Sequence, residues 1–195
     1  TLQIVQQRDS TFSSHSISTG GRLVRYDVNA FLDGEGVDCT LNGLYVASGT
    51  QLVDHHMWVE HGARHGTSRE LFKGIMDDRA RAVFTGRIHV QRGAQQTDAR
   101  QSNRNLLLSD GALVNSNPQL EIFADDVKCT HGSTVGQLDA DALFYLRSRG
   151  LGEAAARSLL VYAFAGEIIA GIKLDEVRAR LEQHLFARLP HGDDG

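Results

Sequence analysis

The sequence predicts a mainly β chain that ends in a small α-helical domain. Residues 2–137 form short runs in which apolar and polar residues alternate, separated by Gly, Asn, Asp and Ser, as is typical of β-strands joined by turns. After Asp139 the apolar residues recur every third or fourth position, which is the period of amphipathic helices. We therefore expect a β domain over residues 1–138, a helical domain over residues 139–190 and a tail over residues 191–195.

The expected strands are short, and no helical segment separates them. Examples are the stretches "GRLVRYDVNAFLDG", "VDCTLNGLYVASG", "RAVFTGRIHVQ" and "PQLEIFADDVKC". A chain of many short strands without helical crossovers must close a barrel, pack two sheets together or coil into a solenoid, because its strand edges would otherwise stay unpaired. The pattern of strands thus allows three architectures.

A cluster of asparagines favours the solenoid, a parallel β-helix. Side-chain amides stacked at the corners of a solenoid can satisfy one another's hydrogen bonds. A loose recurrence of an apolar residue, a glycine and an apolar residue is also visible at residues 41–44, 72–75 and 84–88. Composition alone still allows a sandwich. The four asparagines are Asn103, Asn105, Asn115 and Asn117.

Three helices are expected in the C-terminal part. Asp139 or Asp141 can cap the first, which ends at Gly150. The second follows "EAAARSLLVYAFAGEIIAGI" and the third "LDEVRARLEQHLFARL". Either the rest of the chain or a partner protein must cover an apolar stripe on the third helix, because its members share one face. The stripe consists of Leu174, Val177, Leu181, Leu185 and Leu189.

Composition and charge exclude several classes of protein. The 195 residues are 41% hydrophobic and 23% charged, an ordinary globular mixture. A net charge of −4 with interspersed signs argues against nucleic acid as a partner. The longest apolar run, residues 158–172, is interrupted by Glu167 and glycines and is shorter than the roughly 20 residues of a membrane span. We expect no association with nucleic acid or membrane.

The cysteines and the start of the chain bear on location and completeness. Cys39 and Cys129 are too few and too far apart for a disulfide framework, and no apolar leader with a cleavage site opens the chain. We therefore expect a cytoplasmic protein. The chain opens on Thr1 in the middle of a strand-like pattern, so we also expect it to be a fragment without its N-terminal portion.

Cys129 and His131 are the first candidates for a site. Residues two apart in a strand share a face, so thiolate and imidazole would point the same way. Both are ligands of zinc, iron and iron–sulfur units. Two ligands do not complete a four-coordinate site, and the remainder would have to come from elsewhere. The alternative is a buried cysteine beside a hydrogen-bonded histidine.

The histidines of "DHHMWVEHGARH" form a second cluster. In a strand His55 and His61 share one face and His56 lies on the other, so three histidines do not converge. A rise of about 3.3 Å per residue separates His55 from His61 by roughly 20 Å, too far for one ion. His65 is the fourth histidine of the stretch. We expect a core or surface role for all four, and the alternative is that a neighbouring turn brings one of them toward Cys129.

Signatures of nucleophilic or phosphate chemistry are missing from the sequence. There is no Gly-x-Ser-x-Gly elbow, and "GGR" at residues 20–22 lacks the flanks of a phosphate loop. The acidic pairs Asp77–Asp78 and Asp125–Asp126 could serve a carbohydrate-cleaving β-helix. Aspartates are also common in turns for local hydrogen bonding.

The segments "AQQTDARQSN", "LEIFADDVKC", "HGSTVGQLD" and "LFYLRSRG" occur in the order in which the SufB/SufD family of iron–sulfur cluster assembly scaffolds carries similar segments. The resemblance begins near residue 59, is densest over residues 73–150 and continues to about Leu189. Within the family "VKCTHG" resembles the SufD branch, since the SufB branch carries a Glu-His-Glu segment at this place.

The resemblance implies a right-handed parallel β-helix followed by a C-terminal helical domain. It implies a scaffold and not an enzyme, paired with a SufB-like subunit through the ends of the two β-helices. It also implies docking of a SufC-like ABC-type ATPase on the helices from residue 139 to about residue 189. His131 matches a histidine thought to hold the nascent cluster or iron at the subunit interface, with Cys129 as an auxiliary thiol.

Two other functions remain as rivals: a carbohydrate-active β-helix enzyme, and a purely structural dimerisation module in which Cys129 and His131 merely pack. The isolated fragment is expected to lose the interfacial cluster and to form homodimers through an exposed strand edge.

Overall fold

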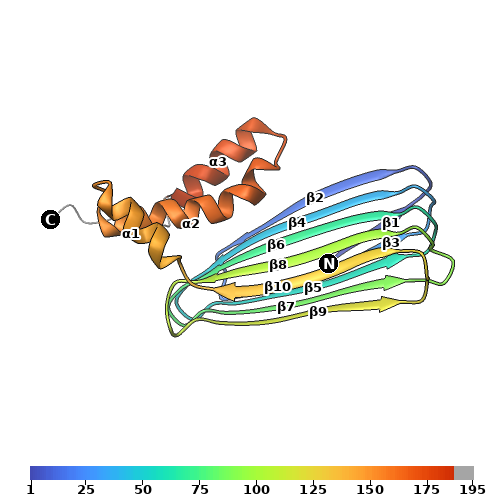
Figure 1. Cartoon of the computed structure of the whole chain (residues 1–195), viewed down its shortest axis with the longest axis horizontal. Helices are drawn as coiled ribbons and strands as arrows, with labels where there is room; N and C mark the ends of the chain where they lie inside the picture. Colours follow the sequence, from blue (N-terminus) through green and yellow to red (C-terminus); the bar gives the residue numbers. More distant parts are fainter. Residues whose placement is uncertain (187–195) are drawn as a thin grey trace. The chain divides into compact units, whose positions relative to one another are not determined.

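The structure is a computed structural model that describes residues 1–186. The chain forms two compact units, Thr1–Val135 and a second unit that begins at Gly136 (Figure 1). The tail expected at residues 191–195 and the end of the expected helical domain, with Leu189, lie outside the described residues.

The first unit is a parallel β-solenoid of about five turns. Its ten strands alternate between two five-stranded sheets, in the orders β1-β3-β5-β7-β9 and β10-β8-β6-β4-β2. The parallel β-helix expected from the sequence is confirmed. The strands are β1 (Leu2–Gln6), β2 (Thr11–Thr19), β3 (Leu23–Leu32), β4 (Asp38–Ala47), β5 (Leu52–His61), β6 (Thr67–Met76), β7 (Arg81–Val90), β8 (Asp98–Leu107), β9 (Leu113–Ile122) and β10 (Lys128–Gly136).

Alternate side chains of each strand fill the interior between the two sheets. In β5 the buried residues alternate with half-buried ones, and His55 and His61 both lie on the buried side, as the strand period predicts. The glycines of the loose recurrence make room for large neighbours. Gly74 lies beneath the ring of Tyr45, and a Cβ atom at Gly86 would lie 2.5 Å from the amide nitrogen of Gln101.

The expectation that the asparagines stack at corners is wrong. Asn103 and Asn105 lie within β8 and are buried between the sheets, where Asn103 donates to the hydroxyl of Tyr45 (3.0 Å) and Asn105 donates to Asn103 (2.7 Å). Asn115 and Asn117 lie in β9 and are exposed. The amides thus form an internal network, because the interior of this solenoid contains polar partners for them.

The second unit contains the three expected helices, α1 (Ala140–Ser148), α2 (Glu153–Ala170) and α3 (Asp175–Phe186). Asp139 caps α1, since its carboxylate accepts from the backbone nitrogens of Asp141 (2.9 Å) and Ala142 (3.0 Å). Gly150 follows α1 with a φ of +93°, which glycine adopts without strain. No helix of residues 1–186 is long and apolar enough to cross a membrane.

Candidate functional site

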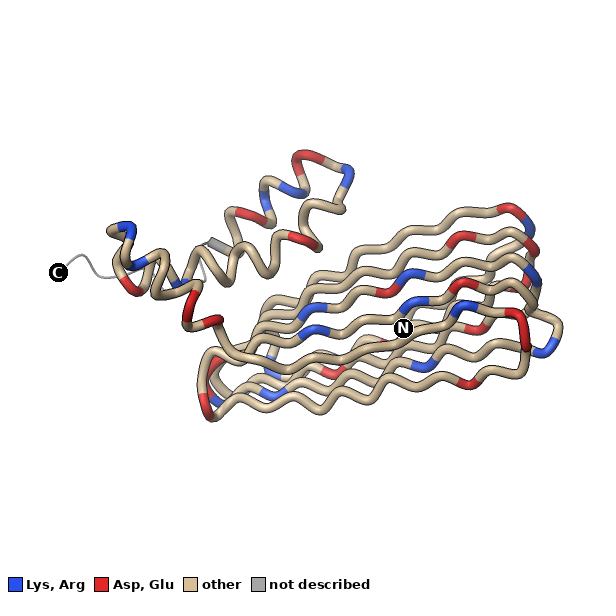
Figure 2. Tube along the Cα trace, viewed as in Figure 1, with Lys and Arg blue, Asp and Glu red and all other residues tan. Residues whose placement is uncertain are grey.

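The last turn of the solenoid ends in two strands that each have a neighbour on one side only. β9 is an edge of the first sheet and β10 an edge of the second. β9 contains one Asp, Glu, Lys or Arg residue, Glu121, and β10 contains one, Lys128, so both strands are almost entirely tan in Figure 2. Exposed edges are usually blunted by charges. β10 contains no proline and is therefore suited to pairing with another chain, whereas Pro118 removes a main-chain donor from the open side of β9.

Apolar side chains are exposed at the same end. Leu113 and Ile122 of β9, Phe123 just after it, and Val135 of β10 have exposed fractions between 40% and 57%. They accompany the free main-chain groups of the two edge strands. Apolar area beside an unpaired edge is typical of a protein interface.

Cys129 and His131 both lie on β10. Cys129 is half-buried and packs against the core of the solenoid, and the period of the strand puts His131 on the same face, where it is exposed. The structure thus brings the two residues to one face at the open end. It places them in no group of three or more His, Cys, Asp or Glu residues that could hold a metal ion within the described chain.

The thiol of Cys129 is held in its protonated form. Burial raises its pKa, the negative charge of Asp98 raises it further, and a backbone hydrogen bond from Ala99 opposes both effects. A metal ion would have to displace this proton, because the thiolate is the ligand. His131 lies on the same face and is exposed.

The other histidines are separated, as the sequence predicts. His55 is buried among the rings of Tyr26, Tyr45 and Phe72, and His61 bonds to the hydroxyl of Ser68 at 2.9 Å. Burial lowers the pKa of both imidazoles to about 4. His56 lies on the outer face, 2.9 Å from the carboxylate of Asp54.

A second polar feature, which the sequence analysis missed, lies inside the solenoid. Glu70 of β6 and Gln101 of β8 are paired in register and almost fully buried, and Gln101 donates from Nε2 to Oε2 of Glu70 at 2.8 Å. Burial raises the pKa of Glu70 to about 7, and the bond from Gln101 partly opposes this. Glu70 is the sole acidic residue among the buried side chains of the described core.

We expect Glu70→Gln to change how stability depends on pH. A carboxyl group with an ordinary pKa of 4.5 that is raised to about 7 in the fold keeps its proton more tightly in the native state. Its contribution to stability is therefore present below pH 4.5 and is lost as the pH rises through 7, up to about 3 kcal/mol in all.

The measurement is urea unfolding of wild type and Glu70→Gln between pH 4.5 and 8, with EDTA present. The lowered pKa values of His55 and His61 have the opposite effect, because the stability that these histidines contribute is lost as the pH falls. Both histidines are present in both proteins. The difference in the free energy of unfolding between wild type and Glu70→Gln therefore reports on Glu70 alone. The variant should gain stability relative to wild type as the pH rises. A constant difference would contradict a raised pKa.

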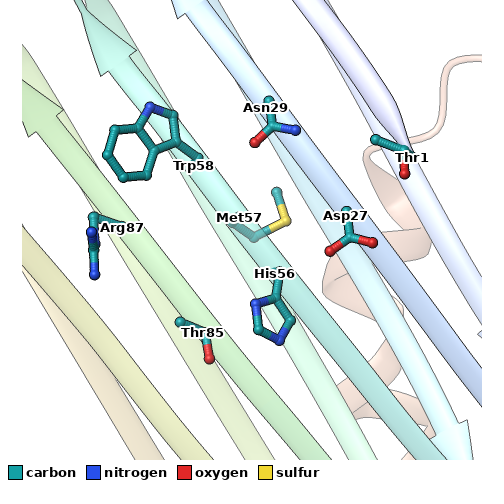
Figure 3. Close-up of a pocket in the computed structure, with 8 residues that line it drawn as sticks. All are labelled: Thr1, Asp27, Asn29, His56, Met57, Trp58, Thr85 and Arg87. Carbon is teal, nitrogen blue, oxygen red and sulfur yellow. The ribbon is translucent and has the colours of Figure 1, made fainter.

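A groove on the outer face of the first sheet is the place where a carbohydrate-cleaving enzyme would need its paired acids. Its cavity volume is about 410 Å³, and Figure 3 shows Asp27, His56, Trp58 and Arg87 around it. Asp27 is its sole carboxylate and is held by Arg25 at 2.8 Å. Because glycoside hydrolysis uses two carboxyl groups, this groove lacks the required pair.

The acidic pairs named from the sequence lie in turns. Asp78 accepts from the backbone nitrogen of Gly49 at 2.8 Å, and Asp77 accepts from that of Asp78 at 2.8 Å. The backbone nitrogen of Asp126 donates to Gln95 at 2.9 Å, and Asp125 is exposed beside it. Local turn bonds account for the first pair.

Comparison with known proteins identifies one family. The family described as SUF system FeS cluster assembly, SufBD core domain, matches residues 1–164. The iron-sulfur cluster assembly protein SufD of Escherichia coli (strain K12) is 40% identical over 184 residues, which cover 94% of this chain and 44% of that protein.

Two further relatives agree. An iron-sulfur cluster assembly SufBD family protein of Synechocystis is 41% identical over 188 residues, covering 96% of this chain and 42% of that protein. The chloroplastic protein ABCI7 of Arabidopsis thaliana is 36% identical over 181 residues, which cover 92% of this chain and 38% of that protein. The chain thus spans less than half the length of these relatives. On this evidence the chain belongs to the SufB/SufD family of iron–sulfur cluster assembly proteins, in its SufD branch.

Proposed function

We propose that the chain is part of a SufD-type scaffold on which an iron–sulfur cluster is assembled at a shared interface with a SufB-type subunit. The observation that carries the proposal is the coincidence, at one end of the solenoid, of Cys129 and His131 with two uncharged edge strands. Family membership supplies the expected partner.

The open end supplies too few ligands to hold a cluster by itself. An iron–sulfur unit needs up to four protein ligands, and β10 offers one imidazole and one protonated thiol. A partner paired through the same edge would supply the rest. His131 is the primary ligand in this proposal, and Cys129 is auxiliary because its proton must first be displaced.

Reconstitution with and without partners tests this assignment. The full-length protein is incubated anaerobically with iron and sulfide, alone and with its SufB-type and SufC-type partners, and cluster content is read from visible absorption and iron analysis. The complex should hold cluster that the isolated protein does not. An equal cluster content in the isolated protein would contradict an interfacial site.

The helical unit is the proposed docking surface for a SufC-type ABC ATPase. Phe144 and Tyr145 of α1 are 74% and 56% exposed, and no residue of α1 is buried. Phe144 and Leu151 also line a groove of about 570 Å³. Nucleotide binding in two docked ATPases would draw the helical units together and strain the interface between the scaffolds.

Phe144→Asp should weaken ATPase docking at least tenfold, because it replaces a large exposed apolar side chain with a charge. Leu23→Asp is the matched control, since Leu23 is 66% exposed but lies on β3 of the solenoid and outside the helical unit. Isothermal titration calorimetry with the ATPase measures both. Equal affinity for wild type and Phe144→Asp would move the docking surface elsewhere.

The same edge gives the isolated protein a route to homodimers, in which a second copy takes the place of the SufB-type subunit. Cys39 and Cys129 are both free thiols, which fits a reducing compartment such as the cytoplasm.

A further inference from the structure

One column of side chains in the second sheet faces the interior and becomes polar after β4. From Leu41 in β4, which lies opposite Ser14 of β2, it continues to Glu70 in β6 and Gln101 in β8, each opposite the next in the register of the sheet. Leu41 belongs to the apolar core, whereas both Glu70 and Gln101 are polar and 2–3% exposed. The column therefore becomes polar in the two turns that precede the last one.

The same column ends at His131. Thr67 and Asp98 are paired across β6 and β8, and there the backbone nitrogen of Asp98 donates to the carbonyl of Gly66, the residue before Thr67. In the same way the backbone nitrogen of Lys128 donates to the carbonyl of Thr97, the residue before Asp98, at 2.8 Å. Lys128 is thus opposite Asp98, and three residues further along the parallel strands His131 is opposite Gln101. With strands about 4.8 Å apart, Glu70 lies about 10 Å inside the strand of His131.

Glu70 and Gln101 each keep one buried oxygen without a partner. Their shared bond uses Nε2 of Gln101 and Oε2 of Glu70, and Oε1 of each residue has no hydrogen-bond partner among the described residues. A buried oxygen without a donor is costly and calls for an explanation. Something positive beside these two oxygens, either a metal ion or a proton on Glu70, would satisfy them.

The backbone leaves space for this pair. Gly86 of β7 faces Gln101 from the opposite sheet, and a Cβ atom at Gly86 would lie 2.5 Å from both Nε2 and Oε1 of Gln101. Any larger residue at position 86 would displace the amide. The glycine thus preserves the place of one of the two unpartnered oxygens.

We propose that Glu70 and Gln101 form an internal site for a divalent cation, one to two turns behind the strand that carries His131. Carboxylate and amide oxygens are ordinary ligands of such ions, and water completes the coordination. The identity of the biological cation as ferrous iron, stored beside the assembly interface, rests on the proposed function. The binding of a divalent cation at this site does not depend on the proposed function.

Anaerobic calorimetric titration of the full-length protein with Fe(II), and with Mn(II) followed by electron paramagnetic resonance, tests the site. Glu70→Gln should lower the affinity at least tenfold, because it removes the charge and keeps the shape. Glu60→Gln is the matched control, since Glu60 lies on the outer face and accepts from Trp58. It should bind like wild type.

Gln101→Glu is a second variant, which adds a carboxylate and should tighten binding several-fold. Circular dichroism confirms that each variant folds. The site is overturned if wild type binds neither ion, or if wild type and Glu70→Gln bind equally, in which case a proton on Glu70 satisfies the pair. His131→Ala separates this proposal from the scaffold assignment, since it should leave Mn(II) binding intact while cluster assembly fails.

Discussion

His131→Ala is expected to reduce the cluster content of the reconstituted complex at least tenfold while leaving the complex assembled. His131 is exposed on the last strand of the solenoid, so its removal leaves no cavity and no unpaired buried group. The loss would therefore report a missing ligand and not a damaged fold. Iron content and visible absorption after anaerobic reconstitution measure it, and size-exclusion chromatography confirms the complex.

His56→Ala is the matched control. His56 lies on the outer face of β5 beside Asp54, away from the open end. Its removal should leave the cluster content unchanged. If His131→Ala assembles as much cluster as His56→Ala, Cys129 and His131 return to a packing role and the structural dimerisation module becomes the better explanation.

Ser133→Pro should weaken pairing with the SufB-type subunit at least tenfold. In a parallel strand the backbone groups of alternate residues point to opposite sides. Because the backbone nitrogen of Lys128 bonds to Thr97, the backbone groups of the even-numbered residues of β10 point toward β8. The backbone groups of the odd-numbered residues point to the open edge. These residues are Cys129, His131, Ser133 and Val135. Proline at 133 thus removes a free edge donor without breaking the bonds to β8.

Ser133→Ala distinguishes the main chain from the side chain, because it removes the hydroxyl and keeps the donor. It should pair like wild type. Light scattering and calorimetry with the SufB-type subunit measure both variants, and the same comparison applies to homodimers of the isolated protein. Unimpaired pairing of Ser133→Pro would show that the partner does not extend the sheet at β10.

The faces of the strands and the ends of the helices could be predicted from the sequence because they depend on the order of apolar and polar residues within a short segment. In β5 apolar and polar residues alternate, so the inward positions of His55 and His61 follow from the pattern. The sequence offers both Asp139 and Asp141 as caps of α1, and the structure shows that Asp139 is the cap. Cys129 and His131 share a face for the same reason.

The internal polar column could not be predicted because apolar and polar residues do not alternate over residues 100–105 of β8. Its inward residues Gln101, Asn103 and Asn105 alternate with Arg100, Ser102 and Arg104, so polar residues occupy both faces. Only the stacking of turns decides which set is buried. The open edge is likewise a property of the whole solenoid, since β10 becomes an edge because it is the last strand and not because of its own residues.

The most direct test of the interfacial site is isotopic. The full-length protein is prepared with ¹⁵N-histidine, combined with unlabelled SufB-type and SufC-type partners, reconstituted and reduced, and examined by electron nuclear double resonance. The account predicts a ¹⁵N coupling at the cluster that disappears in His131→Ala and persists in His56→Ala. A cluster without ¹⁵N coupling in the wild-type complex would contradict it, because the scaffold would then supply no histidine ligand.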